Sequence, residues 1–387
     1  MRILHTSDWH LGQHFIGRSR AAEHQAFLLW LVSQVKALNI DAIIVAGDFF
    51  DTATPPSYAR ELYNQFIVEL QSCQCQLVIL AGNHDAPAVL NESKALLQHL
   101  NTRVVANISD SLHEQLLVLH HRQQPAALLC AIPFLRARDL MQSQAGQSAE
   151  EKQLTLQEAI HQHYQALYRL ARAKRDALQL PLPIIATGHL TTVGASASES
   201  VREIYVGALE AFPSSAFPPA DYIALGHIHR PQKVGGLEHI RYSGSPIALS
   251  FDEARQQKEV LLLEFGAALQ SITPLPVPVF QPMASLRGSL KELAGAIAEA
   301  AAQGTPQRPV WLEVQVSTDD YLSDLQSRIN ALCEGHPVEV LRIRRERGNA
   351  AASLASEARE TLDELSVEDV FARRLQQETL EEEDAQR

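Results

Sequence analysis

Short apolar runs, each followed by polar residues, recur through the first two-thirds of the chain. They are rich in Ile, Val and Leu and are too short for helices, so they predict buried strands. The runs are RILHTS (2–7), DAIIVAGD (41–48), QLVILAGN (76–83), ALLCAIPF (127–134), LPIIATGH (182–189), DYIALGH (221–227), IRYSGS (240–245) and EVLLLEF (259–265).

Between the early runs the pattern changes to a helical period. Apolar residues return every three or four positions from Phe27 to Leu38 and from Leu62 to Leu70. Strands alternating with helices predict an α/β layered architecture over residues 1–272.

The last third of the chain has a different organisation. The Pro-rich segment TPLPVPVFQP (273–282) predicts a linker, because closely spaced prolines exclude a regular helix. Residues 283–345 alternate strand and helix patterns and predict a small α+β domain. Residues 346–387 are amphipathic and Glu-rich, which predicts a helical tail.

Composition limits the class of protein. The 387 residues are 46% hydrophobic and 20% charged, as in an ordinary globular protein. No signal peptide, membrane span or clear cysteine zinc site is evident, so a cytoplasmic location is expected. The net charge of −12 weighs against nucleic-acid binding through bulk electrostatics, although much of this acidity is in the tail.

Five of the predicted strands end in polar turns that carry potential metal ligands. Carboxyl ends of strands gather at one edge in layered α/β folds, so these turns are expected to converge. Gly precedes the polar residue in four of the five and leaves room beside the backbone. The residues are Asp8 and His10, Asp48, Asn83 with His84 and Asp85, His189, and His227 with His229.

Oxygen and imidazole donors without thiolates suit Mn, Fe, Zn or Co. Seven potential ligands are too many for one tetrahedral ion but fit two ions that share a carboxylate. Such a pair activates water for attack at phosphorus, so hydrolysis of a phosphate ester is the predicted chemistry. Each turn taken alone is more often a capped turn than a ligand. Asp51 is expected to cap the helix that follows Pro55 and Pro56, and the alternative is that it tunes the site from behind a ligand.

The motifs D-x-H, G-D, G-N-H-D, G-H and G-H-x-H, in this order, resemble the signature of the calcineurin-like metallophosphoesterases. The resemblance implies a four-layer α/β fold of two packed β-sheets flanked by helices. ILHTSDWHLG, AGDFFDTATPPSYAR, AGNHDAPAVLNES, RYSGSPIALSFDE and LSVEDVFARRL further resemble the SbcD family, the nuclease subunits of bacterial SbcCD complexes.

The resemblance implies a role for each motif residue. Two divalent ions are expected, with manganese preferred and magnesium as the alternative, and Asp48 bridges them. His84 acts at the scissile phosphate and Asp85 orients its ring. The implied ligands are Asp8, His10, Asp48 and His229 for one ion, and Asp48, Asn83, His189 and His227 for the other.

The resemblance also implies partners. The tail is expected to bind SbcC, a coiled-coil ATPase. ATP is expected to act only through this partner. Helices near 58–70 and 92–100 are expected to form a homodimer, with packing on their own domain as the competing interpretation. The 283–345 domain would present DNA ends. Expected contacts to the DNA backbone are Arg18, Arg20, Lys94, Arg202 and Arg230.

Three functions compete on this basis. The first is a nuclease of DNA repair, recombination and replication that cuts single strands and, with ATP, digests double strands. The second is a phosphodiesterase of small or cyclic nucleotides, which would need neither the small domain nor the tail. The third is a scaffold of the same fold, which should have lost ligands. The complete motif set favours the nuclease.

Overall fold

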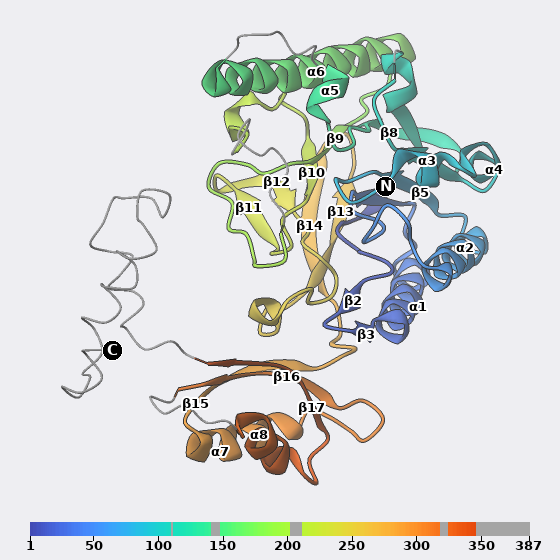
Figure 1. Ribbon diagram of the computed structural model, residues 1–387. Coiled ribbons are helices and arrows are strands. Elements are labelled where there is room, and N and C mark those ends of the chain that lie inside the picture. The colour runs from blue at the N-terminus through green and yellow to red at the C-terminus, as the bar shows by residue number, and fades with distance from the viewer. Residues whose placement is uncertain (110, 141–147, 202–210, 318–323, 346–387) are drawn as a thin grey trace. The chain divides into compact units, whose positions relative to one another are not determined.

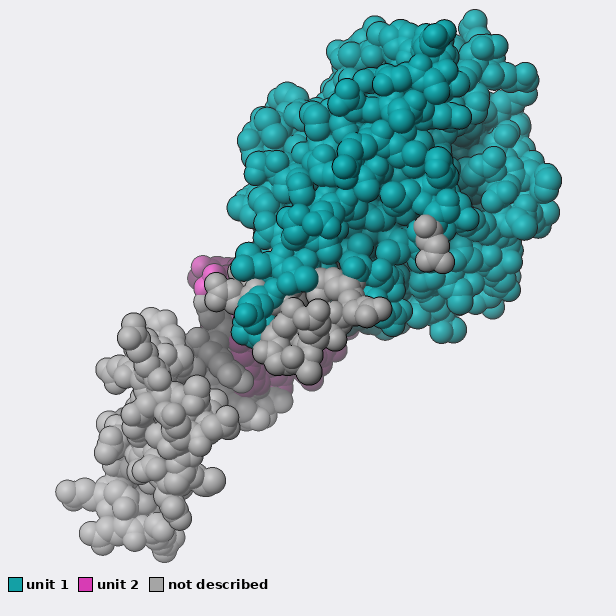
Figure 2. Space-filling view, turned by 90° about the horizontal axis from the view of Figure 1, so that it is seen from above, with its two compact units in different colours: residues 1–283 teal, residues 284–387 magenta. Residues whose placement is uncertain are grey.

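The structure, a computed structural model, describes residues 1–109, 111–140, 148–201, 211–317 and 324–345 (Figure 1). The chain divides into two compact units, residues 1–283 and 284–387, which Figure 2 colours separately. The predicted helical tail, 346–387, lies outside the described residues.

The first unit contains two six-stranded sheets. In the first sheet β1, β4, β5 and β6 run parallel, while β13 and β14 are antiparallel additions at one side. Its order is β14 (Leu269–Pro276), β13 (Glu259–Phe265), β1 (Arg2–Thr6), β4 (Ala42–Ala46), β5 (Gln76–Leu80) and β6 (Thr102–Val105).

The second sheet has a parallel centre with an antiparallel strand at each side. Its order is β11 (Gln232–Val234), β12 (Leu237–Tyr242), β10 (Tyr222–Gly226), β9 (Ile184–His189), β8 (Gln124–Cys130) and β7 (Leu116–His121). Every predicted apolar run therefore overlaps a strand, although β8 and β12 begin three residues before their runs.

Helices cover the outer faces of both sheets (Figure 1). The long helix α6 begins at a capping box in which Ser148 and Glu151 bond each other's backbone. The helices of this unit are α1 (Ala21–Leu38), α2 (Ser57–Gln71), α3 (Pro87–Asn91), α4 (Lys94–Gln98), α5 (Ala137–Leu140) and α6 (Ala149–Leu178). Smaller elements are β2 (His14–Phe15), β3 (Arg18–Ser19), η1 (Leu112–Gln115), η2 (Ser214–Ala216) and η3 (Phe251–Glu253).

Three apolar cores separate these layers. Side chains from both sheets, such as Ile44 and Ile185, fill the space between them. Phe27 of α1 and Phe66 of α2 pack on the outer face of the first sheet, and Tyr164 of α6 packs on that of the second. The order helix, sheet, sheet, helix confirms the predicted four-layer α/β fold.

The predicted linker at 273–282 is wrong in its first part. Thr273–Pro276 belongs to β14, where Pro274 lies opposite Leu261 and Pro276 lies opposite Glu259. Proline cannot donate a ladder hydrogen bond, but β14 is the last strand of its sheet, and an edge strand needs donors on one side only.

The second unit is built around a three-stranded sheet in the order β15, β16, β17, with two helices. Leu293, Ile297 and Ile329 of the helices pack on Leu312 and Val314 of the sheet. The elements are β15 (Met283–Gly288), α7 (Leu290–Ala301), β16 (Val310–Val316), α8 (Leu325–Cys333) and β17 (Val338–Arg345), which match the predicted α+β pattern.

Candidate metal centre

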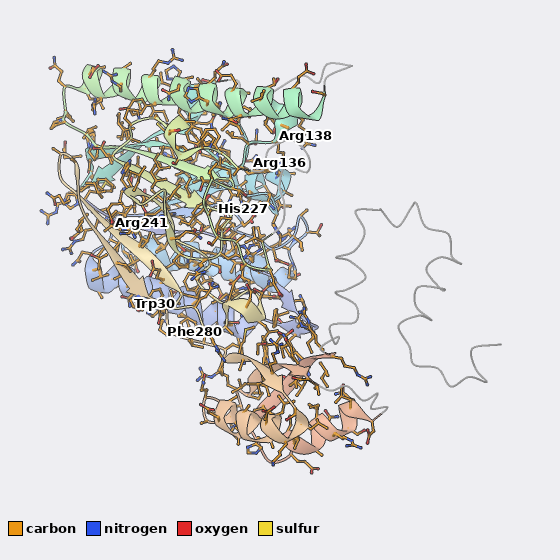
Figure 3. All side chains as sticks on the ribbon, turned by 90° about the vertical axis from the view of Figure 1, so that its left-hand side faces the viewer. Trp30, Arg136, Arg138, His227, Arg241 and Phe280 are labelled. Carbon is orange, nitrogen blue, oxygen red and sulfur yellow. The ribbon has the colours of Figure 1, made fainter. Side chains whose placement is uncertain are left out.

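The polar turns of both sheets meet at one edge of the sandwich. Asp8 and His10 follow β1, Asp48 follows β4 and Asn83 follows β5, all in the first sheet. His189 ends β9, while His227 and His229 follow β10, so these three histidines come from the second sheet. The interior position of His227, 2% exposed, can be followed in Figure 3.

Three sets of side chains have ligand atoms that all lie within 4.8 Å of one another. The sets share members, so they form one continuous cluster rather than separate sites. They are Asp8, His10 and His229; His10, Asp48 and His84; and Asp48, His189 and His227.

Asp48 lies at the centre of this cluster. Its Oδ2 is 3.2 Å from His189 Nε2 and 3.7 Å from His10 Nε2. Asn83 joins the same group, because its Oδ1 is 2.9 Å from His189 Nε2. All seven expected ligands are therefore brought together, whereas metal binding itself stays a prediction.

The backbone is strained where these side chains meet. Asp8, His10, Asp48 and His227 have φ values of 54°, 47°, 48° and 94°, which are uncommon for residues other than Gly. Strain of this kind gathers at functional sites, where surrounding contacts hold it in place. Here the amide of His10 donates to the carbonyl of Asp48 at 3.0 Å, and the amide of His227 donates to Asp8 Oδ1 at 2.9 Å.

Two of the glycines leave room for neighbouring side chains rather than only for a turn. A Cβ on Gly47 would lie 2.1 Å from His189 Nδ1, and one on Gly82 would lie 2.1 Å from Asp48 Oδ1. A larger residue at Gly47 would push against His189 of the second sheet, and one at Gly82 would push against Asp48 within the first sheet.

The cluster has the chemistry of a cation site. His10 Nε2 is buried and has no hydrogen-bond partner in the part of the chain that the structure describes, although it lies 3.7 Å from Asp48 Oδ2. Burial opposes ionisation of Asp48, yet the surrounding imidazoles of His189, His10 and His84 hold its pKa well below its usual range. Burial alone would lower the pKa of His189, but Asp48 outweighs burial and raises it to about 9. The negative charge of the carboxylates therefore favours a positive charge within the cluster.

His84 lies within the cluster, but Asp85 has partners other than the predicted His84 ring. His84 Nδ1 is 2.7 Å from the carbonyl oxygen of Asp51, and its amide donates to Asp48 Oδ1 at 2.9 Å. The carboxylate of Asp85 accepts from the amides of Phe49, Phe50 and Gly82. The prediction that Asp85 orients the His84 ring is wrong, because this carboxylate ties the turn after β4 to the turn after β5.

Asp51 and Arg136 belong to the surroundings of the site, which was only the less favoured interpretation for Asp51 and was not expected for Arg136. Asp51 Oδ1 is 3.1 Å from His10 Nδ1, so Asp51 supports a ligand and does not cap α2, whose N-cap residue is Pro56. Arg136 donates to the carbonyl of Asp85 at 3.0 Å (Figure 3). The D-x-x-D spacing after β4 was the signal for Asp51.

The basic residues expected to contact DNA fall into distinct environments. Arg18 and Arg230 are exposed and Lys94 is half-buried, but Arg202 lies outside the described residues. Arg20 is only 1% exposed, and its guanidinium bonds Glu23 at 2.6 Å. The prediction that Arg20 contacts DNA is therefore wrong, because a buried, ion-paired side chain is not available to a phosphate.

Comparison with known proteins gives two family matches. A family described as calcineurin-like phosphoesterase matches residues 1–231, and one described as type 5 capsule protein repressor C-terminal domain matches residues 279–379. Among the described residues, no helix is long and apolar enough to cross a bilayer.

The chain is also similar to curated proteins that are named as the SbcD component of the nuclease SbcCD. That of Escherichia coli K12 is 55% identical over 388 residues, covering 100% of this chain and 96% of the relative. That of Rhodobacter capsulatus is 35% identical, covering 88% and 86%, and that of Bacillus subtilis is 30% identical, covering 87% and 84%.

Proposed function

The chain belongs to the SbcD family of nuclease subunits, within the calcineurin-like phosphoesterases, and we propose that its strand-end cluster hydrolyses phosphodiester bonds of DNA. The observation that carries the proposal is the convergence of seven carboxylate, amide and imidazole ligands at one buried edge. This donor set suits divalent metals, and we propose manganese as the resident ion, with magnesium as the alternative.

The residues divide into two overlapping ligand sets. When bound, a pair of divalent ions polarises the phosphate and lowers the pKa of the attacking water. Asp48 lies between the two groups of ligands and would help to hold both ions. The proposed sets are Asp8, His10, Asp48 and His229, and Asp48, Asn83, His189 and His227.

His84 is proposed to work on the substrate. Its Nδ1 faces the carbonyl of Asp51, which favours a proton on that nitrogen. In the imidazolium form a second proton is on Nε2, which can then donate to a phosphate oxygen or to the leaving 3′-oxygen, as a general acid does. The products would be a 3′-hydroxyl and a 5′-phosphate. We propose that Asp85 holds the turn that positions His84.

The wider assembly is proposed from the family. The relatives are components of an SbcCD complex, so this chain is proposed to bind SbcC through residues 346–387 and to obtain the effect of ATP from it. Arg18, Lys94 and Arg230 are the remaining proposed DNA contacts among the described residues. The second unit would present DNA ends, and the complex would act in the cytoplasm in repair, recombination and replication.

Asp48→Asn tests the proposed chemistry. The carboxylate is shared by both ligand sets, so its loss should reduce cutting of single-stranded DNA in manganese by about 100-fold or more. The assay compares DNA cutting by parent and variant on a gel, and a reaction with the chelator EDTA is the metal-free control. A parent that cuts equally well in EDTA, or a fully active variant, would overturn the two-metal proposal.

A further inference from the structure

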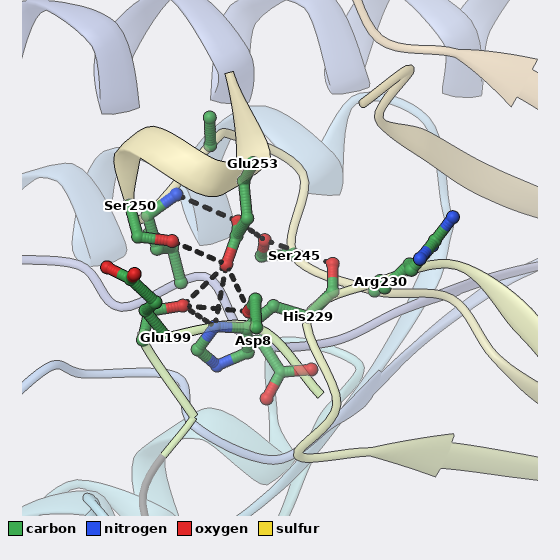
Figure 4. A network of polar contacts seen from close by, with 12 residues as sticks. Asp8, Glu199, His229, Arg230, Ser245, Ser250 and Glu253 are labelled. Carbon is green, nitrogen blue, oxygen red and sulfur yellow. Dashed lines mark hydrogen bonds and ion pairs between the residues drawn. The ribbon is translucent and has the colours of Figure 1, made fainter. Parts of the chain in front are cut away.

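A buried polar network contacts His229 (Figure 4). At its centre is Glu253 of η3, whose side chain is 0% exposed. Glu253 belongs to the segment GSPIALSFDE, which carries none of the proposed ligands. Its carboxylate accepts from Ser198, Ser200, Ser245 and Ser250, from the amide of Leu249 and from Lys258.

The network contacts His229 from two directions. Ser200 Oγ lies 2.6 Å from His229 Nδ1, and Glu253 Oε1 lies 3.4 Å from the same nitrogen. Lys258 Nζ donates to the carbonyl oxygen of His229 at 3.0 Å and to Glu253 Oε2 at 2.7 Å. Both the ring and the backbone of His229 are therefore held by one buried ion pair.

The charge of Glu253 fixes the direction of the hydrogen bonds. A carboxylate paired with the Lys258 ammonium can only accept, so the Ser200 hydroxyl donates to Glu253. The oxygen of Ser200 is then free to accept from His229 Nδ1–H. With its proton on Nδ1, neutral His229 has its lone pair on Nε2, the form in which imidazole binds a metal.

We propose that Glu253 is a positioning residue that, through Ser200, sets the proton and the ring orientation of His229 for metal binding. The inference rests on the proposed function, because it takes His229 as a ligand. His189, in the other ligand set, bonds through Nδ1 to the carbonyl of Ala46 at 3.0 Å instead. The Glu253 network therefore serves the ion held by Asp8, His10 and His229, and not the other ion.

Ser200→Ala and Ser250→Ala form a matched test. Both hydroxyls bond Glu253, at 2.5 and 3.2 Å, but only that of Ser200 contacts His229. The full chain is titrated with MnCl2, followed by calorimetry and by the electron paramagnetic resonance spectrum of bound Mn²⁺. Ser200→Ala should lower the affinity for one of the two Mn²⁺ ions about 10–100-fold, which is the usual effect of removing a hydrogen-bond partner from a metal ligand. Its spectrum should change from a coupled pair to an isolated ion, while Ser250→Ala matches the parent.

Glu253 itself needs a compensated variant. Glu253→Gln would leave the Lys258 ammonium buried without its counter-ion and lower stability. The double variant Glu253→Gln, Lys258→Met removes both charges. The double variant should unfold at the same urea concentration as the parent yet still bind one of the two Mn²⁺ ions weakly. Glu253→Asp keeps a carboxylate and should bind that ion more tightly than the double variant does.

Three results would overturn the inference. Ser200→Ala could bind both ions as the parent does, Ser250→Ala could lose as much affinity as Ser200→Ala, or the double variant could bind both ions normally. If the parent protein binds fewer than two Mn²⁺ ions, the proposed two-metal function fails as well. Failure of the Glu253 role alone can therefore be distinguished from failure of the proposed function.

Discussion

At the scale of single residues, His84 has two competing roles. It can work on the substrate, but its imidazole also belongs to a set with His10 and Asp48 that could hold a metal. His84→Gln separates the roles, because Gln cannot act as a general acid. If His84 transfers a proton, cutting of single-stranded DNA should fall about 10²–10⁴-fold while both Mn²⁺ affinities stay at the parent's values.

Calorimetry with MnCl2, run beside the cleavage assay, measures the two effects on the same protein. Loss of an ion together with activity would assign His84 to the ligands. Unchanged cutting would exclude both roles.

The sequence predicted which residues gather but not how their neighbours are used. Strand ends and their order were enough to expect all seven proposed ligands at one edge. Asp85 and Arg20 were assigned wrongly, and the less favoured interpretation of Asp51 was the correct one, because the roles of all three depend on side-chain direction and burial. Asp85 turns to backbone amides and Arg20 turns inward to Glu23, which a linear pattern does not reveal.

At the scale of elements, His5 joins the two sheets. It lies on β1, and its ring bonds the Tyr222 hydroxyl at 2.9 Å and the Leu225 carbonyl at 3.2 Å, both on β10. Burial lowers the pKa of His5 to about 3, with the Leu225 carbonyl opposing this shift. The folded protein therefore keeps His5 neutral at pH values where an unfolded chain would protonate it.

The stabilising effect of neutral His5 is complete above pH 6.5 and is lost as pH falls toward 3. Between pH 8 and pH 5 this should cost about 2 kcal/mol of unfolding free energy. Urea unfolding of the parent and of His5→Gln at both pH values measures the difference. The variant should lose about 2 kcal/mol less than the parent, and equal losses would contradict the assignment.

Helices and strands were predicted correctly where the spacing of apolar residues within the element decides its structure. The apolar runs and the spacing from Phe27 to Leu38 match strands and a helix. The segment 273–282 misled because two prolines at an edge strand look like a linker in sequence. Only the position of β14 at the end of its sheet makes them compatible with a strand.

At the scale of the whole molecule, two helices offer exposed apolar side chains for the proposed homodimer. Val68 of α2 is 66% exposed and Leu96 of α4 is 63% exposed. Val68→Asp should raise the dimer dissociation constant about tenfold or more, because a charge in an apolar interface is desolvated. Light scattering over a dilution series measures this, with Leu29→Asp on α1, 53% exposed, as the control. Equal effects of the two variants would argue against this interface.

The division into units bears on how the proposed SbcC contact can be tested. The first unit contains every proposed metal ligand and its own three cores, so we expect its chemistry to be independent of residues 346–387. A chain ending at Arg345 should keep the parent's manganese-dependent cutting of single strands. It should fail to retain SbcC on an affinity column and should show no ATP-dependent digestion of double strands when SbcC is added. A truncated chain that still retains SbcC would move the contact to the described units, whereas loss of single-strand cutting would mean that the tail supports the catalytic unit itself.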